Sequence, residues 1–597
     1  MQGGEIMVDE KWMVYAKKAD FNRLGQKYDV DPVVIRVMRN RDVITDDEFE
    51  TYVNATVDKM YSPWLLYDME NAVNIIKNSI IAKKKIRVIG DYDIDGVCSG
   101  HILTAGLEEA GGDVDFTVPD RIIDGYGINE RIIKKAYAAG INVLVTCDNG
   151  IAAIEQIEYA KSLGMTVVVT DHHDVQYEEE DGVRKYLIPN ADAVVNPKHP
   201  KSEYPFKELC GASVAYKVIQ ALFEKIGFTS EKMDKYVVFA GIATIGDVVE
   251  LKDENRIIAK AGIKKLNNTH NVGLNALKEA TGVTDKRITS YTIGFVLGPC
   301  LNAGGRLSTA MKAYSLLHTS DLKEADSIAK ELTELNDKRK DMTVKGFEKA
   351  CEMIDNDEKY NNDSVLLINL PECHESIVGI IAGRIREKYN KPVIVFTEVD
   401  EGLKGSGRSI EEYNMFEKMV KCRELFKKFG GHAMAAGLTI EKDNFEKLRK
   451  RLNDEADLSK EDLTRKIWID VPMPLEYISE KLVYDLDKLE PFGKGNEKPV
   501  FAAKDLIVDR INIFGKNRNV VRIMFRLKNG FPFEATYFTE GDVFAAELEE
   551  KYGKTEVENA FSGRNNNIKM SVVYYPDINE FNGRKSLRVI IRRYMLN

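Results

Sequence analysis

Carboxylate and imidazole side chains recur at the ends of three apolar, β-branched runs in the first half of this sequence. They are Asp91, Asp93 and Asp95 after run 85–90, Asp148 after run 142–146, and Asp171, His172 and His173 after run 165–170. A fourth acid, Asp247, follows an apolar, helix-like segment. One such ending is ordinary turn chemistry, because Asp often starts a loop. Three together indicate a shared site, since buried carboxylates are costly to collect without a cation.

The donor atoms indicate which cation this site would take. Aspartate oxygen and histidine nitrogen without thiolate suit Mn²⁺ or Mg²⁺, with the imidazole favouring Mn²⁺, and Zn²⁺ is a further candidate. Two divalent ions that share a bridging carboxylate can activate water and stabilise an in-line displacement at phosphorus. The pattern therefore predicts hydrolysis of a phosphoester or a phosphoanhydride. The second histidine of the pair could bind metal, act as a general acid or contact the phosphate.

A parallel sheet is needed to bring these side chains together. The runs 85–90, 142–146, 165–170 and 192–196 have the composition of strands buried on both faces, and helical stretches such as 128–139 and 152–163 separate them. This alternation predicts a parallel sheet with right-handed crossovers. Open sheets of this kind bind ligands at the carboxyl ends of their strands, which is where the acids lie.

The rest of the chain divides into three further regions. Residues 321–354 carry apolar positions at helical spacing, which predicts one or two long helices that act as a connector. A second α/β unit follows, with strands at 364–370 and 392–397. From about residue 462, short β-rich segments separated by Gly and Asn turns predict a small barrel or sandwich.

Composition predicts a globular protein of the cytoplasm. The 597 residues predict three or four domains, no apolar run approaches the roughly 20 residues of a membrane span, and the start lacks a signal-peptide pattern. The seven cysteines are scattered, which argues against disulfides and zinc fingers and for a reducing compartment. The net charge of −10 gives no general attraction to nucleic acid, although residues 504–597 hold 16 Lys and Arg against 12 Asp and Glu.

The motifs resemble, in order, those of the DHH phosphoesterase superfamily, and most closely its RecJ-type single-stranded-DNA exonucleases. The matching blocks of the first half are GDYDIDGVCS (90–99), TCDNGI (146–151), TDHHD (170–174) and IGDVVEL (245–251). Those of the second half include GSGRS (405–409), FGGHAMAAG (429–437) and LEPFGKGNEKPVF (489–501). Cys373 and Ser376 depart from the family pattern, which usually has Trp and Gly beside His374. The resemblance covers nearly the whole chain.

The resemblance implies an α/β fold with two parallel-sheet domains, DHH and DHH-associated, joined by a long helix and followed by a C-terminal OB-fold β-barrel. The implied boundaries are an N-terminal extension over 1–60, a DHH catalytic domain over 61–315, connecting helices over 316–358, a DHH-associated domain over 359–460 and an OB-fold nucleic-acid-binding domain over 461–597.

The resemblance also implies roles for individual residues. The metal ligands would be Asp91, Asp93, Asp95, Asp148, His172 and Asp247, and the catalytic set would be Asp93, Asp95, Asp148, His172, His173 and Asp247. For Asp91 and His173 the role stays open between a ligand, support of a ligand and a phosphate contact. The positions that match the nucleic-acid path are Arg121, Asn302, Arg306, His374, Ser406, Arg408 and His432.

The implied activity is 5′-to-3′ hydrolysis of single-stranded DNA to mononucleotides in DNA repair and recombination, with two Mn²⁺ or Mg²⁺ ions. We expect a monomer, with a single-strand-binding protein or a helicase as candidate partners. Two alternatives are a DHH phosphodiesterase for short oligoribonucleotides or cyclic dinucleotides, and an inactive DHH scaffold at a replication fork. The segment 489–501 and the expected barrel argue against the first, and the intact acids of all four motifs argue against the second.

Overall fold

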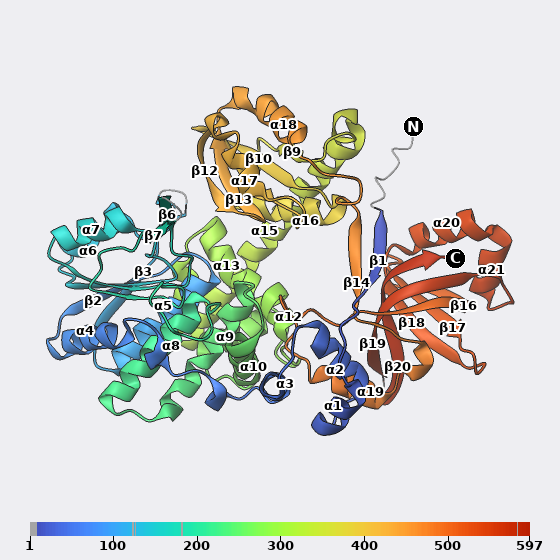
Figure 1. Ribbon diagram of the computed structural model, residues 1–597, viewed down its shortest axis with the longest axis horizontal. Helices are drawn as coiled ribbons and strands as arrows, with labels where there is room; N and C mark the ends of the chain where they lie inside the picture. Colours follow the sequence, from blue (N-terminus) through green and yellow to red (C-terminus); the bar gives the residue numbers. More distant parts are fainter. Residues whose placement is uncertain (1–8, 122–123, 126, 181–182, 582) are drawn as a thin grey trace. The chain divides into compact units, whose positions relative to one another are not determined.

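The computed structural model describes residues 9–121, 124–125, 127–180, 183–581 and 583–597, which form two compact units (Figure 1). The first unit comprises Tyr61–Val249 and Ala261–Lys466 with the described residues before Trp12. The second comprises Trp12–Met60, Glu250–Lys260 and Ile467–Asn597. Among the described helices, none has the length and apolar character that crossing a membrane requires. Three separate stretches of chain therefore build the second unit.

A parallel five-stranded sheet organises the first α/β domain of the first unit, in the order β3-β2-β4-β5-β8. Its strands are β2 (Lys85–Ile89), β3 (Asp113–Thr117), β4 (Val143–Cys147), β5 (Thr166–Thr170) and β8 (Ala193–Val195). All five residues of β4 are buried, as expected for a strand covered on both faces. The predicted strands and their parallel arrangement are confirmed, and β3 is an addition to them.

Helices pack on this sheet in two groups. The first group, α6 (Glu130–Ala138) and α7 (Ile154–Ser162), shares an apolar core with β4 and β5. The second group contacts strands of the same sheet and consists of α4 (Met69–Ile81), α5 (Ile94–Glu109) and α8 (Gly211–Ile226). The domain continues with α9 (Val237–Gly246), α11 (Val272–Ala280), α13 (Gly298–Leu307) and α14 (Met311–His318).

The predicted connector is one continuous helix, α15 (Leu322–Asn356), of 35 residues. It begins at Asp321, whose carboxylate accepts a hydrogen bond from the backbone N–H of Glu324 (2.9 Å). At 1.5 Å per residue its length is about 50 Å. The helix leads from α14 to the second sheet, as the long apolar repeat predicts.

The second sheet is mixed, so the expectation of a parallel sheet in this domain is wrong. Its order is β12-β13-β11-β10-β9, and its strands are β9 (Leu366–Asn369), β10 (Val393–Val399), β11 (Gly402–Arg408), β12 (Phe426–His432) and β13 (Ala435–Ile440). Of its described pairs, only β9–β10 is parallel. The cause is a short connection: only Asp400 and Glu401 join β10 to β11, and a parallel crossover needs a dozen residues or more. Helices α16 (Val378–Tyr389) and α18 (Phe445–Asp454) complete the domain.

The second unit contains a closed β-barrel, as predicted for the C-terminal region. Its strands pair in the order β16 (Phe501–Phe514), β17 (Val520–Arg526), β18 (Pro532–Phe538), β20 (Arg584–Leu596) and β19 (Lys569–Phe581). Strand β19 also pairs with β16, and this pairing closes the barrel. Helices α20 (Gly541–Tyr552) and α21 (Lys554–Ser562) lie between β18 and β19 in sequence. Five strands in a closed Greek-key-like order are typical of an OB-fold.

Residues 12–60, most of the stretch expected as an extension, belong to this second unit. Helices α1 (Phe21–Tyr28), α2 (Pro32–Asn40) and α3 (Asp46–Val53) share one apolar core with the barrel and with α19 (Glu480–Asp487). Val34 and Phe49, for example, belong to the same core as Ile523.

A single buried arginine ties the three stretches of the second unit together. Arg256 is 1% exposed and lies 4.0 Å from the centroid of the Tyr52 ring. Its guanidinium donates hydrogen bonds to the backbone carbonyls of Tyr52 (2.9 Å), Leu489 (2.9 Å), Lys488 (3.2 Å) and Glu490 (2.9 Å). These carbonyls are turned toward one cation, so its removal leaves several acceptors unsatisfied at once.

We predict that Arg256→Met lowers the free energy of opening of the second unit by about 3 kcal/mol, because buried carbonyls lose their donor. Native-state amide hydrogen exchange in α3 and α19 measures this free energy. The matched control is Lys252→Met, since Lys252 is a half-exposed cation of the same segment that pairs with Glu250 (2.8 Å); it should change the free energy by less than about 0.5 kcal/mol. Equal effects of the two changes would contradict the role given to Arg256.

Candidate active site

The carboxyl ends of three neighbouring strands bring the acidic motifs together. Strands β2, β4 and β5 are adjacent and parallel. The first motif follows β2, Asp148 follows β4, and Asp171, His172 and His173 follow β5. Because parallel strands end at the same edge of a sheet, the side chains meet there, as the sequence predicts.

Glycine and asparagine hold the loop of the first motif. Asp93 caps α5: its Oδ1 accepts hydrogen bonds from the backbone N–H groups of Asp95 (2.9 Å) and Gly96 (3.1 Å). A Cβ at position 96 would lie 2.4 Å from the backbone nitrogen of Asp91, so no larger residue fits there. Asn302, on α13, accepts a hydrogen bond at Oδ1 from the backbone N–H of Ile94 (2.8 Å). Asn302 therefore positions this loop, and its contact with nucleic acid stays a prediction.

Asp95 is buried and bound at both carboxylate oxygens by the start of a helix. Its Oδ2 accepts from the backbone N–H of Gly211 (2.7 Å) and its Oδ1 from that of Ala212 (2.8 Å). Both donors lie in the first turn of α8, where the helix dipole favours a negative charge. Burial nevertheless raises the pKa of Asp95.

Like charges are most crowded around Asp91 and Asp148. Burial raises the pKa of both carboxyls well above the usual range, and neighbouring aspartates raise it further, Asp93 beside Asp91 and Asp95 beside Asp148. Oδ1 of Asp91 is buried and has no hydrogen-bond partner among the described residues. A bound cation would remove both costs, since it offsets the repulsion and satisfies the oxygen.

The two histidines of the triplet are held in different states. Nε2 of His172 lies 3.1 Å from Oδ1 of Asp148 and 3.6 Å from Oδ2 of Asp95. Burial lowers the pKa of His172, which favours the neutral imidazole that binds metals. Burial also lowers the pKa of His173, but the hydrogen bond and charge of Asp171 outweigh it and raise this pKa to about 9.

Asp171 orients the histidine pair. Its carboxylate accepts hydrogen bonds from the backbone N–H groups of Ile151 (2.9 Å), His172 (2.7 Å) and His173 (3.2 Å), and its Oδ1 lies 2.8 Å from Nδ1 of His173. Burial raises the pKa of Asp171, but the interactions with His173 prevail and hold it below the usual range. The sequence assigns Asp171 no separate role; the structure makes it the residue that fixes the position of His173.

Three groups of donor atoms could each hold an ion. They are Asp148 with His172 and His173, Asp95 with His172 and Asp247, and Asp91 with Asp93 and Asp148, and the ligand atoms of each group lie within 4.8 Å of one another. Oxygen and imidazole nitrogen without thiolate fit Mn²⁺ and Mg²⁺. Asp148 and His172 each belong to two groups, as shared ligands of neighbouring ions would. The structure thus brings together all the predicted metal ligands and His173.

Two of the residues predicted on the nucleic-acid path lie beside the first motif. Arg306, at the end of α13, donates from Nη1 to the backbone carbonyl of Ser376 (2.8 Å). Burial, and then the nearby Arg121 and Arg339, lower the pKa of Arg306 to about 10. The guanidinium carbon of Arg121 lies 4.7 Å from the centroid of the Tyr92 ring. These cations are therefore close enough to influence one another electrostatically.

The remaining residues of the predicted path lie in the second α/β domain. On β11, Arg408 donates from Nη1 to Oγ of Ser406 (3.1 Å). Nδ1 of His374 lies 2.7 Å from Oγ of Ser376, so the residue that departs from the family pattern contacts a predicted site residue. His432, at the end of β12, lines a cavity of about 870 Å³ whose wall also includes His173.

Sequence reasoning missed two arginines next to this set. Arg339 lies on α15 and Arg384 on α16, and burial, followed by the charge of Arg384, lowers the pKa of Arg339. A charged residue in a long amphipathic helix is normally solvated, so nothing in the sequence marks Arg339 as half-buried. Its nearness to Arg306 emerges only from the tertiary structure.

The fold and this site define a DHH-type phosphoesterase. A family described as "DHH family, N-terminal domain" matches residues 85–246, which carry the first three acidic motifs and end one residue before Asp247. The "DHHA1 domain" family matches residues 362–457, the mixed sheet, and the "RecJ OB domain" family matches residues 469–593, the barrel.

More specifically, the chain belongs to the RecJ family. It is 32% identical to the single-stranded-DNA-specific exonuclease RecJ of Bacillus subtilis, over 98% of this chain and 70% of that protein. It is 30% identical to the RecJ of Haemophilus influenzae, over 95% of this chain and 97% of that protein. In fold it is similar to a crystal structure of Thermus thermophilus RecJ in complex with Mn²⁺, with a TM-score of 0.80 and 24% identity over 98% of this chain and 80% of that chain.

We predict that Asp148→Asn lowers phosphodiester hydrolysis by about a thousandfold or more, because two groups of donor atoms lose a ligand. Titration calorimetry should show that the variant also loses Mn²⁺ binding. The control is Asp113→Asn, an exposed acid at the start of β3 outside the three groups, which should leave both properties unchanged. Hydrolysis by Asp148→Asn within tenfold of the unchanged chain would rule out Asp148 as a shared ligand.

Proposed function

We propose that this chain is a divalent-metal-dependent exonuclease that hydrolyses single-stranded DNA from its 5′ end to mononucleotides, in DNA repair and recombination. The observation that carries this proposal is the cluster of buried aspartates whose pKa values are raised and in which Oδ1 of Asp91 has no hydrogen-bond partner among the described residues. Such a cluster is costly without cations, and its position at the carboxyl edge of a parallel sheet is open to a ligand. Membership of the RecJ family supports single-stranded DNA as the substrate.

The proposed metal site uses Asp91, Asp93, Asp95, Asp148, His172 and Asp247 for two Mn²⁺ or Mg²⁺ ions. When bound, such ions activate water and neutralise charge that develops on the phosphate. The protein holds these ligands in place through Asn302, Gly96 and the first turn of α8.

The proposed role of His173 is to donate a hydrogen bond to the phosphate. Its Nδ1 lies 2.8 Å from Oδ1 of Asp171, so Nε2 is the ring nitrogen that would donate to the phosphate. The raised pKa of about 9 keeps this imidazole protonated at neutral pH, which suits contact with an anion. His432 shares the cavity with His173 and would meet the same end of the strand.

The same proposal gives the strand a path along Arg121, Arg306, His374, Ser406, Arg408 and His432. The domain roles follow the boundaries implied by the sequence, with the barrel holding DNA rather than cutting it. A monomer that acts in the cytoplasm with a single-strand-binding protein or a helicase completes the proposal.

Hydrolysis of end-labelled strands tests the function. Single-stranded DNA labelled at the 5′ end should release labelled mononucleotide at once with Mn²⁺ or Mg²⁺, whereas a 3′ label should remain on long fragments until late. EDTA should stop the reaction, and the Asp148→Asn variant is the matched inactive control. Preferential cleavage of short RNA would favour the oligoribonucleotide alternative, and no hydrolysis of any substrate would favour the inactive scaffold.

We further predict that Arg408→Ala slows hydrolysis of 5′-phosphorylated strands about tenfold more than that of 5′-hydroxyl strands. Arg408 and Ser406 offer a guanidinium and a hydroxyl that already contact each other, and a terminal phosphate carries more charge than an internal one. The control is Lys404→Ala, on the same strand, because Lys404 pairs with Glu375 (2.5 Å). Equal losses on both kinds of strand would mean that Arg408 contacts the backbone without selecting the end.

A further inference from the structure

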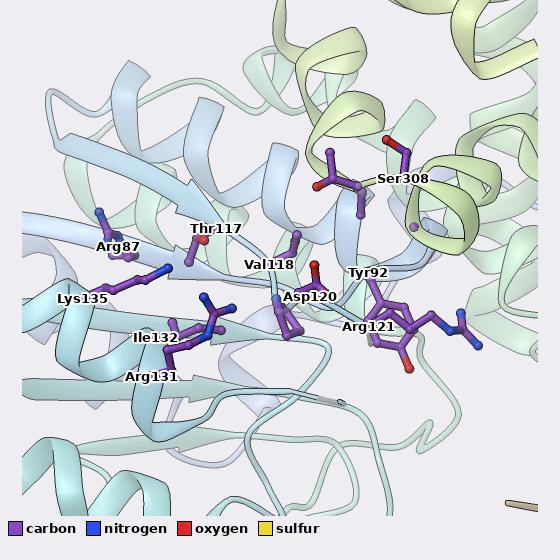
Figure 2. Close-up of a pocket in the computed structure, with 14 residues that line it drawn as sticks. Arg87, Tyr92, Thr117, Val118, Asp120, Arg121, Arg131, Ile132, Lys135 and Ser308 are labelled. Carbon is purple, nitrogen blue, oxygen red and sulfur yellow. The ribbon is translucent and has the colours of Figure 1, made fainter. Parts of the chain in front are cut away.

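A pocket of about 150 Å³ lies beside the first motif, entirely within the first α/β domain (Figure 2). Its walls come from β2, the end of β3, α6 and the segment that joins α13 to α14. Tyr92, which stands between Asp91 and Asp93 in sequence, lies on its border. The volume is that of about five water molecules at roughly 30 Å³ each, which leaves room for one phosphate group.

Three cationic side chains lie near one another at one end of this pocket. Figure 2 shows Arg87, Arg131 and Lys135 there, near Thr117. Arg87 comes from β2, whereas Arg131 and Lys135 lie one turn apart on α6, so their charged ends are presented from two different elements. Three cations in one place repel one another. The chain as a whole carries a net charge of −10, so an overall excess of cations does not explain why they gather here.

Carboxylates outside the lining fix the direction of the two arginines. Arg87 donates from Nε and Nη2 to Asp115, at 2.6 Å each. Arg131 donates from Nε to Asp124 (2.6 Å) and also from Nη2. Among the described residues, Nη1 of neither guanidinium has a hydrogen-bond partner, so each arginine keeps donors for a further anion. Orientation by a carboxylate lowers the entropy lost when that anion binds.

Lys135 differs from its neighbour in having no ion pair among the described residues. The preceding residue, Lys134, pairs with Glu130 (2.9 Å) and does not line the pocket. The pocket lining also includes the cation Arg121 and the carboxylate Asp120. Even when the carboxylates that hold the two arginines are counted, the pocket keeps one net positive charge.

We propose that this pocket binds one internal phosphate group of the single strand, at a place distinct from Ser406, Arg408 and Arg306. Arg87, Arg131 and Lys135 supply charged donors, and the hydroxyl of Thr117, at the same end of the pocket, supplies a neutral one. The strand, as the source of the phosphate, rests on the proposed function. Two positions support the strand as the source. Tyr92 borders the pocket and belongs to the first motif, and Arg121 lies over the Tyr92 ring and near Arg306. A strand held at Arg121 and Arg306 would have a neighbouring phosphate beside this pocket.

Lys135→Ala is the variant that tests the subsite, because the exposed Lys135 side chain has no ion pair to lose within the described part of the chain. Binding of a fluorescent oligodeoxythymidylate is measured by anisotropy in EDTA, over a range of KCl concentrations. We expect the variant to bind about three- to tenfold more weakly. The magnitude of the slope of log binding constant against log KCl concentration should fall by about 0.7, the contribution of one phosphate of a single strand. Lys134→Ala, also exposed and one residue away, should change neither quantity.

Calorimetry with inorganic phosphate separates the two possible sources of the ligand. If Lys135→Ala binds the oligonucleotide like Lys134→Ala but loses heat of phosphate binding, the pocket takes free phosphate and the strand assignment is overturned. If neither measurement changes, the pocket is no phosphate site. The binding test in EDTA does not depend on hydrolysis. If the chain shows the Lys135-dependent salt effect in EDTA but does not cut DNA with Mn²⁺ or Mg²⁺, the proposed activity is overturned and the subsite is retained.

Discussion

Repulsion among aspartates at one edge of the parallel sheet is the constraint on which the rest of the first unit depends. Two negative charges about 5 Å apart repel by about 3 kcal/mol at an effective dielectric constant of about 20, and several such pairs occur here. Total folding stability is only about 5–15 kcal/mol, so the cluster must be supported. The first turn of α8 at Asp95, the bond from Ile94 to Asn302 and the absence of a side chain at Gly96 supply that support.

Within this cluster, neighbouring side chains of the same type have different electrostatic environments. His172 faces two carboxylates and its own pKa is lowered, whereas His173 is paired with Asp171 and its pKa is raised. One imidazole is thereby suited to a metal and the other to an anion, although they are adjacent in sequence. Asp171 separates the two roles, because its carboxylate accepts hydrogen bonds from the backbone N–H groups that fix the turn and also bonds to the imidazole of His173.

Sequence patterns predicted what depends on local order along the chain. The runs before Asp91, Asp148 and Asp171 are strands whose ends meet, because burial on both faces and strand–helix alternation are visible in composition. The mixed second sheet was missed because its direction depends on the short connection at Asp400 and Glu401 rather than on strand composition. Arg256 and Arg339 were missed because burial of an arginine depends on packing partners far away in sequence. The predicted domain boundaries and nucleic-acid contacts stay predictions.

The composition of the second unit from distant stretches of chain affects how the protein is made. Helices α1 to α3 leave the ribosome before the barrel, and about 400 residues separate Met60 from Ile467, where their main partner begins. At about 5–20 residues per second, synthesis of that interval takes about 20–80 s. During this time Val34, Ile35 and Phe49, buried in the finished core, lack the barrel that covers them. The nascent chain therefore exposes an apolar surface throughout this interval. Chaperones bind such segments, and without chaperones such segments aggregate.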